Sequence, residues 1–162
     1  MNFKTSRKGQ AWYADFMIGL TLFLSVIGIY YTFQSAFSED TTGVEDLIAD
    51  AKQISNMLVS PGYPDSWTAV DVQRIGLTNN TPRIVVSKVE QFGLMNYSTT
   101  RNRFRTGYNY VVYFREGDEN ITLPNNQTFI GREPVNATDL VTALRFVIYD
   151  SRIAQMEVQV WR

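Results

Sequence analysis

The chain has 162 residues, a net charge of −1 at pH 7 and 44% apolar residues. This size corresponds to about one ordinary domain. The apolar content and the near-neutral charge together exclude a disordered tail and a strongly basic nucleic-acid-binding protein. The sequence contains neither cysteine nor histidine. Their absence excludes disulfides, thiolate chemistry and zinc or haem ligation by these residues. It also excludes every Ser-His or Cys-His catalytic arrangement.

The N-terminal segment carries basic residues and then a long uncharged run. The basic residues come without any acid among them and are Lys4, Arg7 and Lys8. Residues 16–38 contain no charge, and a helix of this length would extend about 35 Å, enough to cross a hydrocarbon core of about 30 Å. Since Glu39 and Asp40 follow the run, the positive-inside rule places the N-terminus in the cytoplasm and the C-terminal domain outside.

The order of these features resembles that of a known family. Arg7-Lys8-Gly9-Gln10 is followed by a single acid, Asp15, at the start of the apolar run. This order is similar to the class III signal of archaeal type IV pilin-like proteins. The resemblance implies that a membrane peptidase cuts after Gly9 and that Gln10 becomes the first mature residue. It also implies that the apolar helix stays on the mature protein.

Asp15 is the sixth residue counted from Gln10, whereas many members of that family carry an acid at the fifth mature position. A carboxylate at the edge of a membrane helix is costly unless it is paired. Cleavage creates an ammonium at Gln10, and we expect Asp15 to pair with it. The alternative is that Asp15 lies at the headgroup level and favours the helix N-terminus.

The sequence predicts four segments. Residues 1–9 are expected to form a basic leader cleaved after Gly9, and residues 10–38 the hydrophobic helix. The polar stretch 39–43 is expected to act as a hinge, because it separates two helical patterns. Residues 44–162 are expected to form an extracellular α+β head domain.

The head domain is predicted to begin with a second, amphipathic helix. Thr42-Gly43-Val44-Glu45 matches a capping box, and apolar residues then follow helical spacing up to Ser60-Pro61-Gly62. The turn Tyr63-Pro64-Asp65-Ser66-Trp67 follows, and the alternation over 70–77 predicts a short strand. This order of helix, turn and strand also resembles the heads of archaeal pilin-like membrane proteins. Trp67 is expected to close the core rather than to stack on a ligand.

Two short helices are predicted between residues 87 and 104. Ser87-Lys88-Val89-Glu90 matches a second capping box, and Ser98 or Thr99 can cap the next helix. Three arginines cluster in this region, Arg101, Arg103 and Arg105. Because no Gly-rich phosphate loop lies nearby, a solvated or intersubunit face is favoured over an anion site.

The C-terminal half is predicted to form an antiparallel sheet. Residues 108–114 are rich in aromatic and β-branched side chains, whereas 118–137 are predicted to form loops with short edge strands. Residues 140–149 and 152–161 alternate around a short turn, which predicts a C-terminal hairpin. The expected fold class is therefore α+β, with a long hydrophobic N-terminal helix, a second amphipathic helix and this sheet.

Five Asn-x-Ser/Thr sequons lie on the predicted outer side, at Asn79, Asn96, Asn120, Asn126 and Asn136. They predict N-glycosylation, since surface-filament proteins of archaea are often glycosylated. The alternative is that these polar residues occur together because of turn chemistry.

These features favour a structural protein over an enzyme. The leading hypothesis is a major or minor subunit of an archaeal type IV pilus-like surface filament. Its partners would be copies of itself or other pilin-like subunits, the prepilin peptidase and the membrane. The alternative is a non-polymerising, membrane-anchored binding or adhesion domain. No catalytic residue, metal ligand, cofactor or nucleic-acid partner is expected, because the acid pairs that could act in catalysis lie in polar turns, Glu116 with Asp118 and Glu119 with Glu133.

Overall fold

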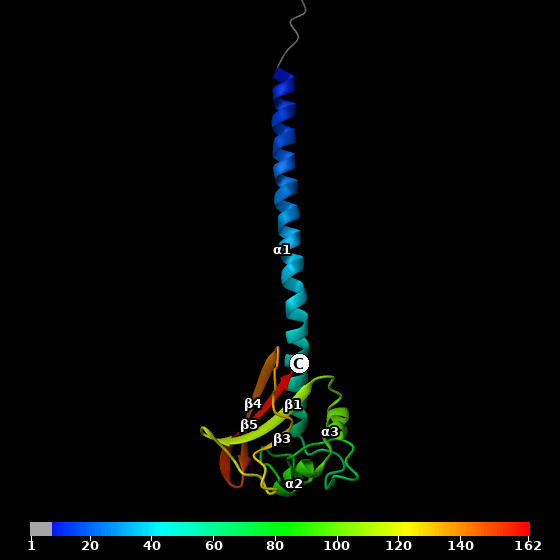
Figure 1. Ribbon diagram of the computed structural model, residues 1–162, viewed down its shortest axis with the longest axis vertical. Helices are drawn as coiled ribbons and strands as arrows, with labels where there is room; N and C mark the ends of the chain where they lie inside the picture. Colours follow the sequence, from blue (N-terminus) through cyan, green and yellow to red (C-terminus); the bar gives the residue numbers. More distant parts are fainter. Residues whose placement is uncertain (1–7) are drawn as a thin grey trace, which may run out of the picture. The chain divides into compact units, whose positions relative to one another are not determined.

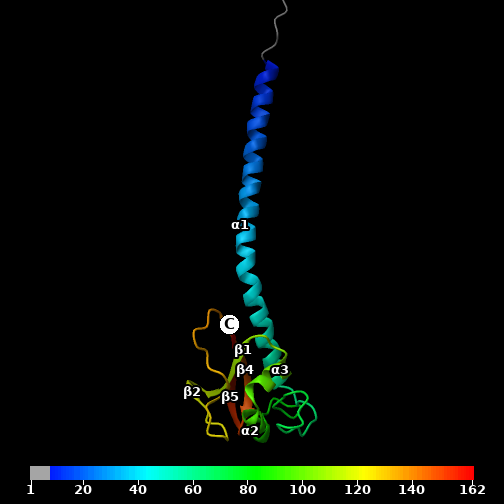
Figure 2. The same ribbon diagram turned by 45° about the vertical axis from the view of Figure 1, so that its right-hand side comes forward.

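A computed structural model describes the backbone of residues 8–162 and the side chains of residues 12–34 and 43–162 (Figures 1 and 2). It confirms the predicted α+β class, with a long apolar N-terminal helix and an antiparallel sheet that ends in a C-terminal hairpin. The elements follow in the order α1 (Lys8–Leu58), α2 (Val86–Leu94), α3 (Tyr97–Phe104), β1 (Asn109–Glu116), β2 (Glu119–Asn120), β3 (Phe129–Gly131), β4 (Leu140–Tyr149) and β5 (Arg152–Trp161).

The backbone of α1 is helical through residues 39–43, so the sequence break expected there is absent from the secondary structure. The stretch is Glu-Asp-Thr-Thr-Gly and contains no proline. Glu, Asp and Thr each cost a helix at most about 0.7 kcal/mol and Gly43 about 1 kcal/mol, far less than the roughly 3 kcal/mol of a proline. The predicted second helix is therefore the C-terminal part of α1. The chain still divides into two compact units between Gly43 and Val44. The hinge itself stays a prediction, and the Thr42 side chain of the expected capping box lies outside the described side chains.

The sheet is antiparallel throughout, with strand order β2-β1-β5-β4, and β3 pairs with β1 beside β2. β5 lies between β1 and β4, and Figure 1 shows the β4–β5 hairpin running as two long neighbouring strands. Its turn consists of Asp150 and Ser151, which both have positive φ, 45° and 66°. This is the pattern of a two-residue type I′ hairpin turn, and it confirms the predicted C-terminal hairpin.

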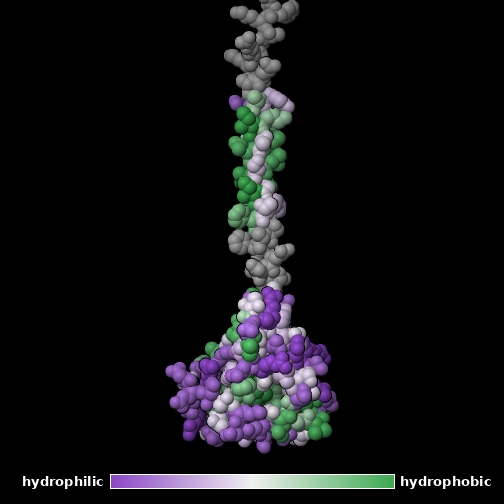
Figure 3. Space-filling view, in the orientation of Figure 1, coloured by the Kyte–Doolittle hydropathy of each residue, from purple (hydrophilic) through white to green (hydrophobic). Residues whose placement is uncertain are grey.

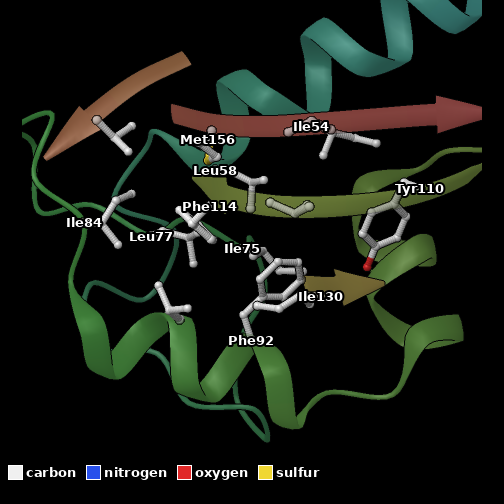
Figure 4. Packing of buried hydrophobic residues seen from close by; sticks show 14 of the residues in the cluster. Ile54, Leu58, Ile75, Leu77, Ile84, Phe92, Tyr110, Phe114, Ile130 and Met156 are labelled. Atoms are coloured by element: carbon white, nitrogen blue, oxygen red, sulfur yellow. The ribbon is translucent and has the colours of Figure 1, made fainter. Parts of the chain in front are cut away.

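The inner face of the sheet forms the main core with the residues that begin the head domain. On this face β1 and β5 bury side chains that alternate along each strand, which include Tyr110, Val112, Phe114, Met156 and Val158. Helical spacing on α1 buries Leu47, Ala51, Ile54 and Leu58 in the same cluster. Figure 4 shows that Ile54 and Leu58 lie near Met156, and that Phe92 of α2 points into the same core from the opposite side.

A smaller cluster covers the outer face of β1. Val111, Tyr113 and Trp161 are buried there, with Phe129 and Ala137 packed against them. Since β1 is buried on both faces, it reads in the sequence as a continuous apolar and aromatic run rather than as a strict alternation.

Residues 59–85 have no regular secondary structure, so the prediction of a strand over 70–77 was wrong. The side chains alternate in burial, with Val72, Ile75 and Leu77 buried and Val70 95% exposed, but the backbone forms only isolated bridges. Trp67 is 2% exposed and its Nε1 donates to the carbonyl oxygen of Gly76 at 2.8 Å. The prediction that Trp67 closes the core is confirmed.

Lys88 of α2 fixes this irregular segment to the helix. Its side chain is buried, and Nζ donates to the carbonyl oxygens of Pro61 at 2.6 Å and Thr78 at 2.9 Å. Burial lowers the pKa of Lys88, and the charge of Asp65 opposes this shift. One cation therefore satisfies two carbonyl groups from separate parts of the segment.

The two short helices are present, but their predicted caps were wrong. α2 begins after Val85, which makes no side-chain cap, and Ser87 lies inside the helix. α3 is capped by Asn96, whose Oδ1 accepts from the backbone N–H of Ser98 at 2.9 Å. The cap is therefore Asn96, two positions before the expected Ser98. Asparagine is as effective as serine at this position.

Candidate functional site

The apolar segment of α1 is the most extensive feature with no internal packing. Residues Trp12–Gln34 form 23 helical residues with a mean hydropathy of 1.9, none of them buried within the chain. Figure 3 shows hydrophobic side chains along the described part of this segment. The segment is long and apolar enough to span a membrane.

The serine and threonine hydroxyls of this segment are satisfied inside the helix. The hydroxyls of Thr21 and Ser25 donate to the carbonyl oxygens of Met17 and Thr21, each at 2.8 Å, and Thr32 donates to Ile29. These bonds let hydroxyl side chains stay in an apolar environment without an unpaired donor.

The aromatic side chains of this segment are largely exposed. Trp12 stacks on Phe16 with ring centroids 6.1 Å apart, and Tyr30 meets Tyr31 edge to face. Phe16, Phe23 and Tyr30 recur every seven residues and are each more than half exposed. They thus form a row of exposed aromatic side chains along the helix.

The residues predicted for processing lie at the start of α1. Gly9 and Gln10 have helical backbone, whereas residues 1–7 of the predicted leader and the side chains before Trp12 lie outside the described residues. Asp15 is exposed, one residue before the uncharged run begins. Among the described side chains it has no ion-pair partner, so a pairing with the Gln10 ammonium requires the processed chain.

All five sequon asparagines are exposed in the head domain. Asn126 and Asn136 have positive φ, 58° and 52°, which places both in tight turns. In two sequons the Ser or Thr hydroxyl donates to the Oδ1 of its own asparagine, with Thr81 bound to Asn79 at 2.7 Å and Ser98 to Asn96 at 2.6 Å. Sequon exposure and turn chemistry therefore occur together at these sites.

Asn120 differs from the other four because it lies within a strand pair. It belongs to β2, and its Oδ1 accepts from Nε of Arg115 at 3.0 Å. Its side chain is exposed, so the amide nitrogen stays accessible.

The arginine cluster divides into two environments. Arg101 donates from its guanidinium to the carbonyl oxygen of Gly107, while Arg103 and Arg105 are exposed. Arg132 lies over the ring of Tyr97, 5.1 Å from its centroid, and lines the same 330 Å³ pocket as Arg101. The structure thus brings Arg132 to Arg101, a neighbour that the sequence spacing did not reveal.

A second pocket lies between α3, β1 and β3. It has a volume of about 410 Å³ and is lined by Tyr97, Tyr110 and Phe129 together with the 126–128 sequon. Tyr110 stacks on Tyr97 with ring centroids 5.2 Å apart, and its hydroxyl contacts the Thr100 hydroxyl. Burial raises the pKa of Tyr110 well above its ordinary value. The phenol therefore stays neutral and serves packing.

The acid pairs considered for catalysis are solvated. Glu116, Asp118, Glu119 and Glu133 are exposed, and Glu116 accepts from Nη1 of Arg152 at 3.1 Å. Within the part of the chain that the structure describes, no group of three or more acidic side chains that could hold a metal ion comes together.

These observations define a class of protein in which an α+β head follows an N-terminal helix long and apolar enough to span a membrane. The chain belongs to a family described as "Family of unknown function (DUF7287)", whose model matches residues 6–161. No curated protein matches the chain, and no solved structure matches it.

Proposed function

We propose that this protein is a structural subunit of an archaeal type IV pilus-like surface filament, assembled through its N-terminal helix. The observation that carries this proposal is the 23-residue segment Trp12–Gln34, none of which is buried within the chain. Fourteen large apolar side chains of this segment are exposed. Full burial of an exposed Val, Leu, Ile, Phe or Met side chain stabilises by about 1.5–3 kcal/mol, so burial of this surface by lipid or other helices is strongly favourable.

The order of charges supports processing of the N-terminus and one orientation. The basic residues before the apolar segment favour the cytoplasm, which puts the head domain on the outer side. Cleavage after Gly9 would leave Gln10 as a charged terminus within six residues of Asp15. In a bundle of such helices, this ammonium can pair with the Asp15 carboxylate of the same or a neighbouring chain.

The head domain supports a role at the surface. Its core is formed by its own residues, and all five sequon asparagines are exposed and available for glycosylation. A self-sufficient head leaves the apolar helix free to act as the assembly element. Such a division suits a subunit that is held in the membrane before assembly and in a helix bundle afterwards.

The proposal is tested by following the N-terminus of the chain and its assembly together. In the wild type, N-terminal sequencing of membrane or filament material is expected to begin at Gln10. Gly9→Val places a β-branched side chain next to the cut, so this variant is expected to insert but to keep its leader and to fail in assembly. Gly107→Val, in the head domain and outside the apolar helix, is the matched control, because a Cβ at Gly107 meets no atom within 4 Å.

Two results would overturn the proposal. The first is an intact Met1 on wild-type protein isolated from membranes, which would favour the membrane-anchored binding domain instead. The second is normal filament formation by the Gly9→Val protein with the leader retained, because processing would then be irrelevant to assembly.

A further inference from the structure

β4 is an edge strand with a free side over most of its length. Among the residues that the structure describes, β4 pairs only with β5, and its other side is bonded only at Ile148. There the carbonyl oxygen of Ile148 accepts from the N–H of Ile84 at 2.8 Å, and its N–H donates to Pro82 at 2.9 Å. The edge therefore already accepts one strand-like segment at its C-terminal end.

The bonds of Ile148 reveal which residues face the free edge. In an antiparallel ladder, alternate residues direct both backbone groups to the same side. Since Ile148 directs its groups away from β5, the residues of the same parity do so too, and these are Leu140, Thr142, Leu144 and Phe146. Among the described residues, no hydrogen bond reaches their backbone N–H and C=O groups from the free side.

The side chains of these residues make the outer face next to the edge apolar. Leu144 is 56% and Phe146 72% exposed, and Ile153, at the start of β5, is 74% exposed beside them. Natural edge strands are normally protected by Lys, Pro or inward-pointing charges. β4 has only Arg145, whose guanidinium is held by Oδ1 of Asn56 at 2.7 Å.

From these observations we infer that β4 pairs with β4 of a second copy of this chain, antiparallel, about a two-fold axis at Ala143. Only in this register does each of the four free-edge residues stand opposite another free-edge residue. Leu140 of one copy stands opposite Phe146 of the other, and Thr142 stands opposite Leu144. A register centred on Leu144 would place Leu140 against Ile148, which already has a partner. No acidic or lysine side chain opposes another across the pair, because β4 contains none.

The size of the contact explains when it forms. The apolar patch has far fewer residues than the roughly 20–30 a side of a stable interface, so free heads would pair weakly. Copies held in one membrane by their apolar helices have a much higher effective concentration. The inference thus rests on the membrane anchoring in the proposed function and not on filament assembly.

The test uses disulfide formation in the full chain in its membrane. The sequence contains no cysteine, so Ala143→Cys introduces the sole thiol. Ala143 would face its symmetry mate in a non-hydrogen-bonded pair, with Cα atoms about 4.5 Å apart, within the range of disulfides. Val70→Cys, at a residue 95% exposed and distant in sequence, is the control for random collision.

With mild oxidant, Ala143→Cys is expected to give about tenfold more covalent dimer than Val70→Cys, as effective concentration favours the specific pair. Adding Leu144→Lys and Phe146→Lys, both at exposed positions, is expected to reduce the dimer to the control level while the melting temperature is kept. The dimer is expected to persist with Gly9→Val, which separates this contact from filament assembly.

The inference is overturned if Ala143→Cys gives no more dimer than Val70→Cys, or if the two lysines leave the yield unchanged. Cross-linking to a protein of another mass would show that a different partner occupies the edge and would also overturn it. Loss of the dimer in the Gly9→Val protein would also overturn it, because pairing would then depend on filament assembly rather than on anchoring in the membrane.

Discussion

Tyr110 places a phenol hydroxyl inside the core of the head domain. The Thr100 hydroxyl donates to the carbonyl oxygen of Tyr97 at 2.9 Å, so the Tyr110 hydroxyl is left to donate to Thr100. Burial is the main cause that raises the pKa of Tyr110 above its ordinary value of 10.0. The folded state therefore holds this proton more tightly than the unfolded state does.

This difference predicts how stability depends on pH. A raised pKa contributes stability that is fully present below the unfolded pKa of about 10 and is lost as the pH rises beyond it. Tyr110→Phe removes the titrating group and is expected to cost about 1 kcal/mol at pH 8, because one buried hydrogen bond is lost. We expect this cost to shrink between pH 10 and 11, as measured by thermal unfolding of both proteins. Tyr63→Phe, at an exposed ring, is the control, and a cost that stays constant with pH would contradict the assignment.

Single residues differ in how far the sequence predicts their environment. Trp67 was correctly placed in the core because an aromatic residue after a proline turn usually closes one. The buried role of Lys88 was not foreseen, since a lysine in a capping-box pattern normally points to solvent. Its two carbonyl partners, Pro61 and Thr78, come together only through the path of the irregular segment.

The β4–β5 hairpin depends on a turn that its sequence only partly suits. Asp150 and Ser151 both adopt positive φ, where Asp is tolerated and Ser is less favourable than Gly. The long register on both sides holds the turn, with Tyr149 opposite Arg152 at its end. The strands thus impose the turn conformation on Ser151.

Ser151→Gly is therefore expected to stabilise the head domain by about 0.5–1 kcal/mol, because glycine adopts positive φ without a steric cost. Ser87→Gly is the matched control, since Ser87 is also exposed but lies in the helical backbone of α2. The same change there is expected to destabilise the helix. Chemical unfolding of the two variants checks the opposite signs, and equal effects would contradict the argument.

At the level of elements, prediction succeeded where periodicity and burial agreed. The hairpin and the buried helical face of residues 44–58 show clear periods, and the structure confirms both. The pattern over 70–77 also alternates, but its backbone bonds go to distant partners, such as Tyr63 N–H to the carbonyl of Arg74. Alternation reports which side chains are buried, whereas a strand also requires a neighbouring ladder. The free edge of β4 could not be predicted, because it depends on the order of strands in the sheet.

At the scale of the whole molecule, the two units carry different chemistry. The apolar helix presents its side chains outward, whereas the head buries its apolar residues in its own core. The sequence was sufficient to predict this division, since the uncharged run and the charged remainder are separate in the chain. The role proposed for the charges at the N-terminal end of the helix concerns cleavage and assembly, so it is tested on membrane and filament material.

Asp15→Ala examines this role directly. If the carboxylate pairs with the Gln10 ammonium in an apolar helix bundle, its removal leaves an unpaired buried charge and costs about 3–5 kcal/mol. A carboxylate at the headgroup level would contribute under about 1 kcal/mol. We expect Asp15→Ala to insert and to be processed normally, as shown by an N-terminus at Gln10, while the yield of filaments falls sharply. Asp118→Ala, which removes an exposed acid of the head, is expected to assemble like the wild type. Wild-type filament yield from Asp15→Ala would make the acid an interfacial residue and favour the membrane-anchored binding domain.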